Sequence, residues 1–181
     1  MIRNYAHKKL RQMAQHYDYD TSYMEFLLEQ DLGQFLRFTV VQGLGNYRGQ
    51  VPPAVWFCCS LRTIQREDCG PCIQLVARMA AEQGVPEHTL LAILQGDASK
   101  LDSETQLALD YTDAVLERSD RLLDLRQAIL ERWGKPGIIA LGFAITTSRM
   151  YPTLKYALGY GHSCQAVNLQ STTWHPEPAP A

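Results

Sequence analysis

Nothing in the chain resembles a membrane span, because no apolar run approaches the roughly 20 residues needed to cross a bilayer. The basic start, residues 1–9, is not followed by an apolar block, so we expect no secretory signal there. The net charge of −2 over 181 residues lacks the positive excess of a general nucleic-acid binder. Five cysteines, an odd number, argue against the disulfide framework of a small secreted protein. These absences predict a cytoplasmic protein that binds neither membranes nor nucleic acid.

Long stretches of alternating polar and apolar residues are also missing, which argues against a β-sheet core. Apolar residues instead recur at helical spacing through most of the chain. A chain of 181 residues with 46% hydrophobic residues can bury one substantial core. We therefore expect an all-α fold, with residues 1–50 as a helical extension, 51–165 as the main domain and 166–181 as a mobile tail.

Glycine, proline and capping residues predict where helices begin and end. Gly33 is expected to divide two helices, and Pro52-Pro53 to open the next one. Ser103 with Gln106 resembles a capping box at a later helix start. Pro152 is expected to kink or break the last apolar run.

The most informative stretch is Cys69-Gly70-Pro71-Cys72, followed by an amphipathic run that stops at Gly84. It predicts a Cys-X-X-Cys pair at a helix N-terminus, where unpaired N–H groups and the helix dipole favour a thiolate. Gly-Pro between the cysteines, with Glu67-Asp68 before them, is typical of an exposed turn. Such a pair can cycle between dithiol and disulfide.

Two other interpretations of the pair are a zinc half-site and two inert, buried cysteines. Zinc would need a second Cys/His pair at close spacing. The remaining candidates do not form one: Cys58, Cys59, Cys164, His88 and His162. We therefore expect no metal or cofactor. Cys58 and Cys59 fall inside an apolar helical stripe and are expected to be packed core residues.

Thioredoxins carry the same Cys-Gly-Pro-Cys motif, and Pro152-Thr153 resembles the Pro-Thr near their active site. Thioredoxin's cysteines follow a β-strand, however, whereas helical runs precede and follow both motifs here. The all-α pattern therefore disfavours a thioredoxin fold.

The order of motifs resembles the carboxymuconolactone decarboxylase-like family, which includes alkylhydroperoxidase D. The resemblance covers about residues 50–165. Four blocks carry it: the apolar helix from Pro53 into the cysteine pair, residues 79–86, residues 102–116 and the apolar run 138–145. It implies an all-α, alkylhydroperoxidase D-like fold that assembles as a homo-oligomer, a trimer or a hexamer.

The resemblance also implies a chemistry. In the redox-active branch of the family, the second cysteine attacks peroxide and becomes a sulfenic acid. The first cysteine then condenses with it to a disulfide, which a dithiol or lipoyl partner reduces. Carried over to this chain, Cys72 is the attacking residue and Cys69 the resolving one.

Two positions depart from the family's hydroperoxidases. Their histidine, four residues after the second cysteine, is Val76 here, and their glutamate, twelve residues before the first, is Phe57. Glu67 or Asp68, beside the pair, and His162, at a helix end, are the candidates to replace this proton relay. The alternatives are charges that stabilise the helix N-terminus and a surface histidine.

Two functions follow from the sequence. One is a thiol-dependent peroxidase, or a related dithiol–disulfide oxidoreductase, that takes a peroxide and a dithiol or lipoyl reductant. The other is a non-catalytic helical oligomer that binds a small apolar ligand or a partner protein, which the missing relay residues favour.

Overall fold

The computed structural model is almost entirely helical and describes residues 1–161, 166–169 and 171–175. The helices in chain order are α1 (Ile2–Tyr17), α2 (Ser22–Gln30), α3 (Leu32–Gly45), α4 (Pro53–Arg66), α5 (Gly70–Glu82), α6 (Glu87–Gln95), α7 (Ser103–Glu117) and α8 (Leu122–Ala157). A 3₁₀ helix, η1 (Ala98–Lys100), precedes α7, and two short strands, β1 (Val167–Asn168) and β2 (Thr173–Trp174), follow α8. The expected all-α character is confirmed. Within these ranges, no helix is long and apolar enough to cross a membrane.

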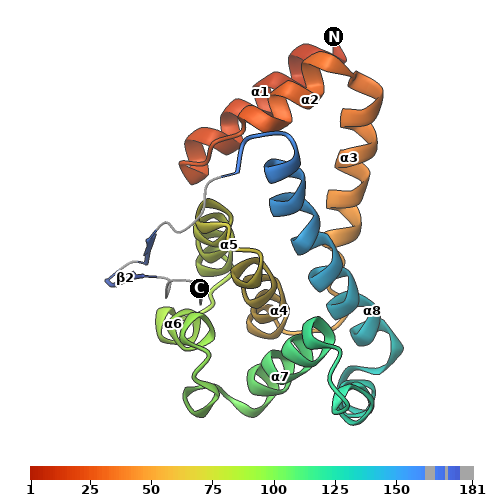
Figure 1. The fold of residues 1–181 in the computed structure, drawn as a ribbon, viewed down its shortest axis with the longest axis vertical. Coiled ribbons are helices and arrows are strands. Elements are labelled where there is room, and N and C mark those ends of the chain that lie inside the picture. The colour runs from red at the N-terminus through yellow and green to blue at the C-terminus, as the bar shows by residue number, and fades with distance from the viewer. Residues whose placement is uncertain (162–165, 170, 176–181) are drawn as a thin grey trace.

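The main core surrounds α4, which packs against α5, α6, α7 and α8 (Figure 1). A helix with neighbours on several sides must be apolar around most of its circumference. Accordingly, Phe57 and Leu61 are at most 1% exposed, and Cys58 and Cys59 are fully buried. The prediction that these two cysteines are packed core residues is confirmed.

The first three helices enclose a second core and lie across one end of the molecule (Figure 1). Its buried residues are Ala6, Leu10, Tyr19, Tyr23, Met24, Leu28, Phe35 and Phe38. Leu75 of α5 and Met150, Tyr151 and Leu154 of α8 pack against them. Residues 1–50 therefore cover the beginning of α5 and the last turns of α8, and this contact shapes the site described below.

Two predicted helix boundaries are wrong because aspartate side chains cap the helices instead. α3 begins after Asp31, whose carboxylate accepts a backbone N–H of the first turn at 3.1 Å, so Gly33 lies inside the helix. Asp102, rather than Ser103, caps α7 and accepts two backbone N–H groups at 3.0 Å each. Aspartate is among the preferred N-cap residues, and each of these stands directly before its helix.

The break expected at Pro152 is also wrong, because α8 continues through this residue to Ala157. The irregular point of α8 is Gly134, with φ 65° and ψ −167°. A positive φ suits glycine, and Pro136 then restarts the helix in its first turn. The long second part of α8 can therefore extend from the main core to the N-terminal helices.

Part of the expected mobile tail forms an antiparallel strand pair, with Val167 opposite Trp174. Val167 is fully buried and Trp174 is 9% exposed. The Gln74 amide of α5 exchanges two hydrogen bonds with the backbone of Asn168, at 2.8 and 2.6 Å. The segment is thus attached to α5, which the polar sequence did not predict; residues 176–181 lie outside the described part of the chain.

Candidate functional site

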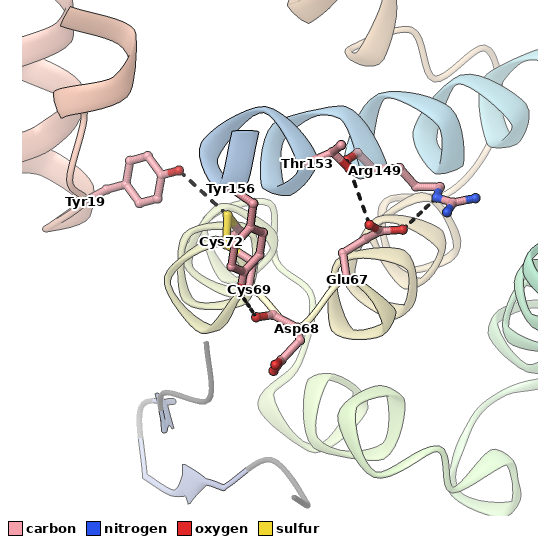
Figure 2. The surroundings of a disulfide bond; sticks show 8 residues. All are labelled: Tyr19, Glu67, Asp68, Cys69, Cys72, Arg149, Thr153 and Tyr156. Carbon is pink, nitrogen blue, oxygen red and sulfur yellow. Dashed lines mark hydrogen bonds and ion pairs between the residues drawn. A yellow bond between two sulfur atoms is a disulfide. The ribbon is translucent and has the colours of Figure 1, made fainter. Parts of the chain in front are cut away.

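The candidate site is a disulfide between Cys69 and Cys72, where α4 leads into α5 (Figure 2). Asp68 adopts the left-handed conformation, φ 50°, which turns the chain, and Cys69 then directly precedes the first residue of α5. Pro71 is accommodated because N–H groups of a first helical turn have no intrahelical partner. The two Cα atoms are 5.3 Å apart, a usual span for a disulfide.

Both cysteines are buried, which corrects the expectation of an exposed turn. Cys69 is 1% exposed and Cys72 is 3% exposed. Tyr19, from the loop between α1 and α2, places its hydroxyl 3.8 Å from the Cys72 Sγ (Figure 2). The Tyr156 hydroxyl of α8 donates a hydrogen bond to the Asp68 carbonyl at 2.9 Å. The covering side chains come from segments far away in sequence, so the local Gly-Pro pattern could not reveal them.

A cavity of about 260 Å³ lies against Cys72. Its wall is mainly aromatic and aliphatic and comes from the N-terminal helices, α4, α5 and α8. Cys69 does not belong to this wall as far as the described residues define it. Two wall residues of α4, Trp56 and Ser60, have a buried Nε1 and Oγ for which the described part of the chain provides no hydrogen-bond partner. The cavity therefore combines an apolar wall with one reactive sulfur and a few polar atoms.

The two positions that depart from the resembled hydroperoxidases, Phe57 and Val76, both line this cavity together with Cys72. Phe57 comes from α4, and Val76 lies one helical turn after Cys72 on α5. The residues present there are apolar, so they transfer no protons. They make the wall beside Cys72 more suitable for an apolar molecule.

Lys155 of α8 is fully buried, close to the rings of Tyr19 and Tyr23. Its Nζ lies 4.9 Å from the ring centre of Tyr19 and 5.5 Å from that of Tyr23, and it has no hydrogen-bond partner among the described residues. Burial lowers the pKa of Lys155, an effect that the Asp20 carboxylate opposes. Burial also raises the pKa of Tyr19 to about 12. Lys155 thus lies over the ring of Tyr19, the tyrosine whose hydroxyl reaches Cys72.

Glu67 lies beside the pair, but its carboxylate points towards α8 (Figure 2). It accepts a hydrogen bond from Arg149 Nε at 2.7 Å and one from the Thr153 hydroxyl at 3.5 Å. Glu67 therefore links the α4–α5 turn to α8. Nothing in this arrangement supports Glu67 as a base for Cys72. Of the other two relay candidates, Asp68 contacts Tyr156 through its backbone carbonyl, and His162 lies outside the described residues.

The other two described cysteines have a different environment. Burial raises the pKa of the Cys58 thiol well above its usual range and that of Cys59 to about 12. Each lies within 4 Å of a backbone carbonyl of α7, at 3.6 Å for Cys58 and 3.9 Å for Cys59. They are structural thiols. The described residues contain no group of three or more His, Cys, Asp and Glu side chains that could hold a metal ion.

The sequence analysis missed Tyr19 and Lys155. Tyr19 lies in a polar, tyrosine-rich segment with no recognisable motif. Lys155 had a usable signal, because a lysine between Leu154 and Tyr156 in an apolar and aromatic stretch must either reach solvent or find a buried partner. No protein-family model, curated protein or solved structure matches the chain.

Proposed function

We propose that the protein is a thiol-dependent peroxidase, or a related dithiol–disulfide oxidoreductase, that uses Cys72 and Cys69. The observation that carries the proposal is the double position of Cys72, which is bonded to Cys69 and also lines the cavity. Cys72 belongs to the first turn of α5, where helix N–H groups and the dipole favour a thiolate. A molecule in the cavity would meet this sulfur first.

The reaction needs a hydroperoxide as oxidant, the two cysteines, and a dithiol as reductant. The Cys72 thiolate attacks a hydroperoxide oxygen: an S–O bond forms, the O–O bond breaks, and the alkoxide leaves as an alcohol after taking a proton from water. The Cys69 thiol then attacks the sulfenic acid, which forms the disulfide and releases water. A dithiol or lipoyl-type reductant restores both thiols and becomes a disulfide itself.

The wall of the cavity supports an organic hydroperoxide with an apolar body as the oxidant. Phe57 and Val76 exclude a Glu–His relay at the positions where the resembled family has one. Because positioned acid–base groups typically contribute about 10²–10⁴-fold, we expect slow turnover unless other residues help. The joint position of Phe57, Val76 and Cys72 in one cavity supports the family resemblance, whose homo-oligomer remains a prediction that analytical ultracentrifugation can measure.

The second candidate function is the binding of a small apolar ligand without catalysis. The burial of both cysteines and the apolar cavity favour it. In that case, Cys72 is part of the wall and the disulfide keeps its oxidation state.

Turnover by cysteine variants tests the proposal. Reduced protein is mixed with cumene hydroperoxide and dihydrolipoamide, and peroxide consumption is followed. Cys72→Ser should abolish consumption, whereas Cys69→Ser, tested without dihydrolipoamide, should consume one equivalent and keep a sulfenic acid at Cys72, detected with dimedone. Cys58→Ala, a buried cysteine outside the cavity, is the matched control and should turn over normally. Undiminished turnover by Cys72→Ser would exclude the proposal and leave the ligand-binding function.

A further inference from the structure

Three residues from distant parts of the chain form a continuous set of contacts at the disulfide. Tyr19, between α1 and α2, reaches the Cys72 Sγ of α5 at 3.8 Å (Figure 2). Lys155 of α8 holds its ammonium 4.9 Å from the ring centre of the same tyrosine. Tyr19 is 6% exposed and Lys155 is fully buried, so solvent competes little for either group.

The direction of the Tyr19 contact follows from the chemistry of sulfur. A disulfide sulfur carries no hydrogen, so the hydroxyl of Tyr19 is the donor to Cys72. After reduction, a Cys72 thiolate would be a better acceptor for the same hydroxyl, because hydrogen bonds to charged groups are stronger than neutral ones. This donor stabilises the thiolate relative to the thiol.

Lys155 is placed over the Tyr19 ring, where it can strengthen this donor. An ammonium over an aromatic face is attracted by the ring's electrons and withdraws density from the ring. The hydroxyl of Tyr19 then carries more positive charge on its hydrogen.

We propose that Tyr19 is a catalytic residue that donates a hydrogen bond to the Cys72 thiolate, and that Lys155 is a positioning residue that acts through the Tyr19 ring. The inference rests on the proposed function, since it concerns the same cysteine pair. The thiol proton of Cys72 passes to water, and Tyr19 keeps its own proton throughout. The donor thus comes from residues 1–50, outside the part of the chain that resembles the known family.

The surrounding charges are compatible with this role. Burial raises the pKa of Tyr19 to about 12, so the hydroxyl remains a donor at neutral pH. Asp20 from the same loop, Tyr23 from α2 and Tyr151 from α8 interact with Tyr19, while Glu67, Asp68 and Arg149 lie around the α4–α5 turn. The carboxylates among them disfavour the Cys72 thiolate, and a hydrogen bond from the Tyr19 hydroxyl offsets that effect.

The pKa of the Cys72 thiol tests Tyr19 directly. In the Cys69→Ser background, the alkylation rate of Cys72 by iodoacetamide is measured from pH 5 to 10 with site-specific mass spectrometry. Tyr19→Phe should move the midpoint upwards by about one unit, equal to about tenfold less thiolate at neutral pH. Tyr17→Phe is the matched control, because Tyr17 lines the same cavity but donates its hydroxyl to Glu82 at 2.8 Å, so the Cys72 midpoint should not move. The midpoint is insensitive to changes in access that alter all rates equally.

A double-mutant cycle tests Lys155. Lys155→Met should also raise the midpoint, and the combined Tyr19→Phe/Lys155→Met variant should shift it no further than Tyr19→Phe alone. Additive shifts would contradict action through Tyr19. Circular dichroism of each variant confirms that its midpoint describes the folded protein.

The inference and the proposed function can fail separately. An unchanged Cys72 midpoint in Tyr19→Phe overturns the role of Tyr19, even where the wild type closes its disulfide with peroxide. A wild type that does not close its disulfide overturns the proposed function, whatever the midpoints show.

Discussion

The Cys69–Cys72 disulfide should contribute little to stability, which a redox centre requires. The two cysteines are three positions apart, so the bond closes a loop of only four residues. The chain-entropy relation gives about 2 kcal/mol at 25 °C for a loop of this size, against almost 5 kcal/mol for one of about 100 residues. For a chain of this length, that corresponds to a fall in Tm of about 4–8 °C. We therefore expect the reduced protein to remain folded.

Urea unfolding with and without a phosphine reductant measures this difference. The Cys69→Ser/Cys72→Ser variant should match the reduced wild type and should not respond to the reductant. Tryptophan fluorescence and far-UV circular dichroism should give the same midpoint if unfolding is two-state. A loss well above about 4 kcal/mol, or unfolding on reduction alone, would refute the reasoning and identify the bond as a structural cross-link.

Further predictions concern the buried ionisable groups. Burial raises the pKa values of Cys59, Tyr19 and Tyr151 to about 12, from ordinary values of 9.0 for the cysteine and 10.0 for the tyrosines. As the pH rises, the unfolded chain therefore loses these protons before the folded protein does. The free energy of unfolding should be constant below about pH 9 and fall towards pH 12, by up to about 1.4 kcal/mol per pH unit for each group. A urea midpoint that stays flat between pH 8 and 10.5 would contradict this. Lys155→Met should stabilise the fold by about 1 kcal/mol, because it removes a buried charge that has no hydrogen bond within the described ranges. A large destabilisation in urea would show that the contacts of Lys155 with the aromatic rings outweigh the cost of burying its charge. Cys58 and Cys59 should resist iodoacetamide in the native protein at pH 8 and react after unfolding, as peptide mass spectrometry can establish.

The helical architecture was predictable because its signals are local. The proline pair at the start of α4 and the apolar stripe that includes Cys58 and Cys59 depend on the residues of one helix alone. The helix starts at Asp31 and Asp102 were missed although their signal is also local, since aspartate competes with nearby glycine and serine for the capping position.

The site was predictable only in part. The Cys-X-X-Cys motif indicated the pair, but its burial depends on Tyr19 and Tyr156, which lie about 50 residues before Cys72 and more than 80 residues after it. Packing between α1, α5 and α8 decides that contact, and no periodicity within one segment encodes it. The same packing creates the cavity at Cys72, so its apolar wall could not be read from the sequence.

The most direct test of the central claim is mass spectrometry of differentially alkylated thiols, before and after a stoichiometric pulse of cumene hydroperoxide on the reduced protein. The account predicts that Cys69 and Cys72 convert to an intramolecular disulfide within seconds, while Cys58 and Cys59 stay reduced. A pair that stays reduced under these conditions would contradict a redox function for the site.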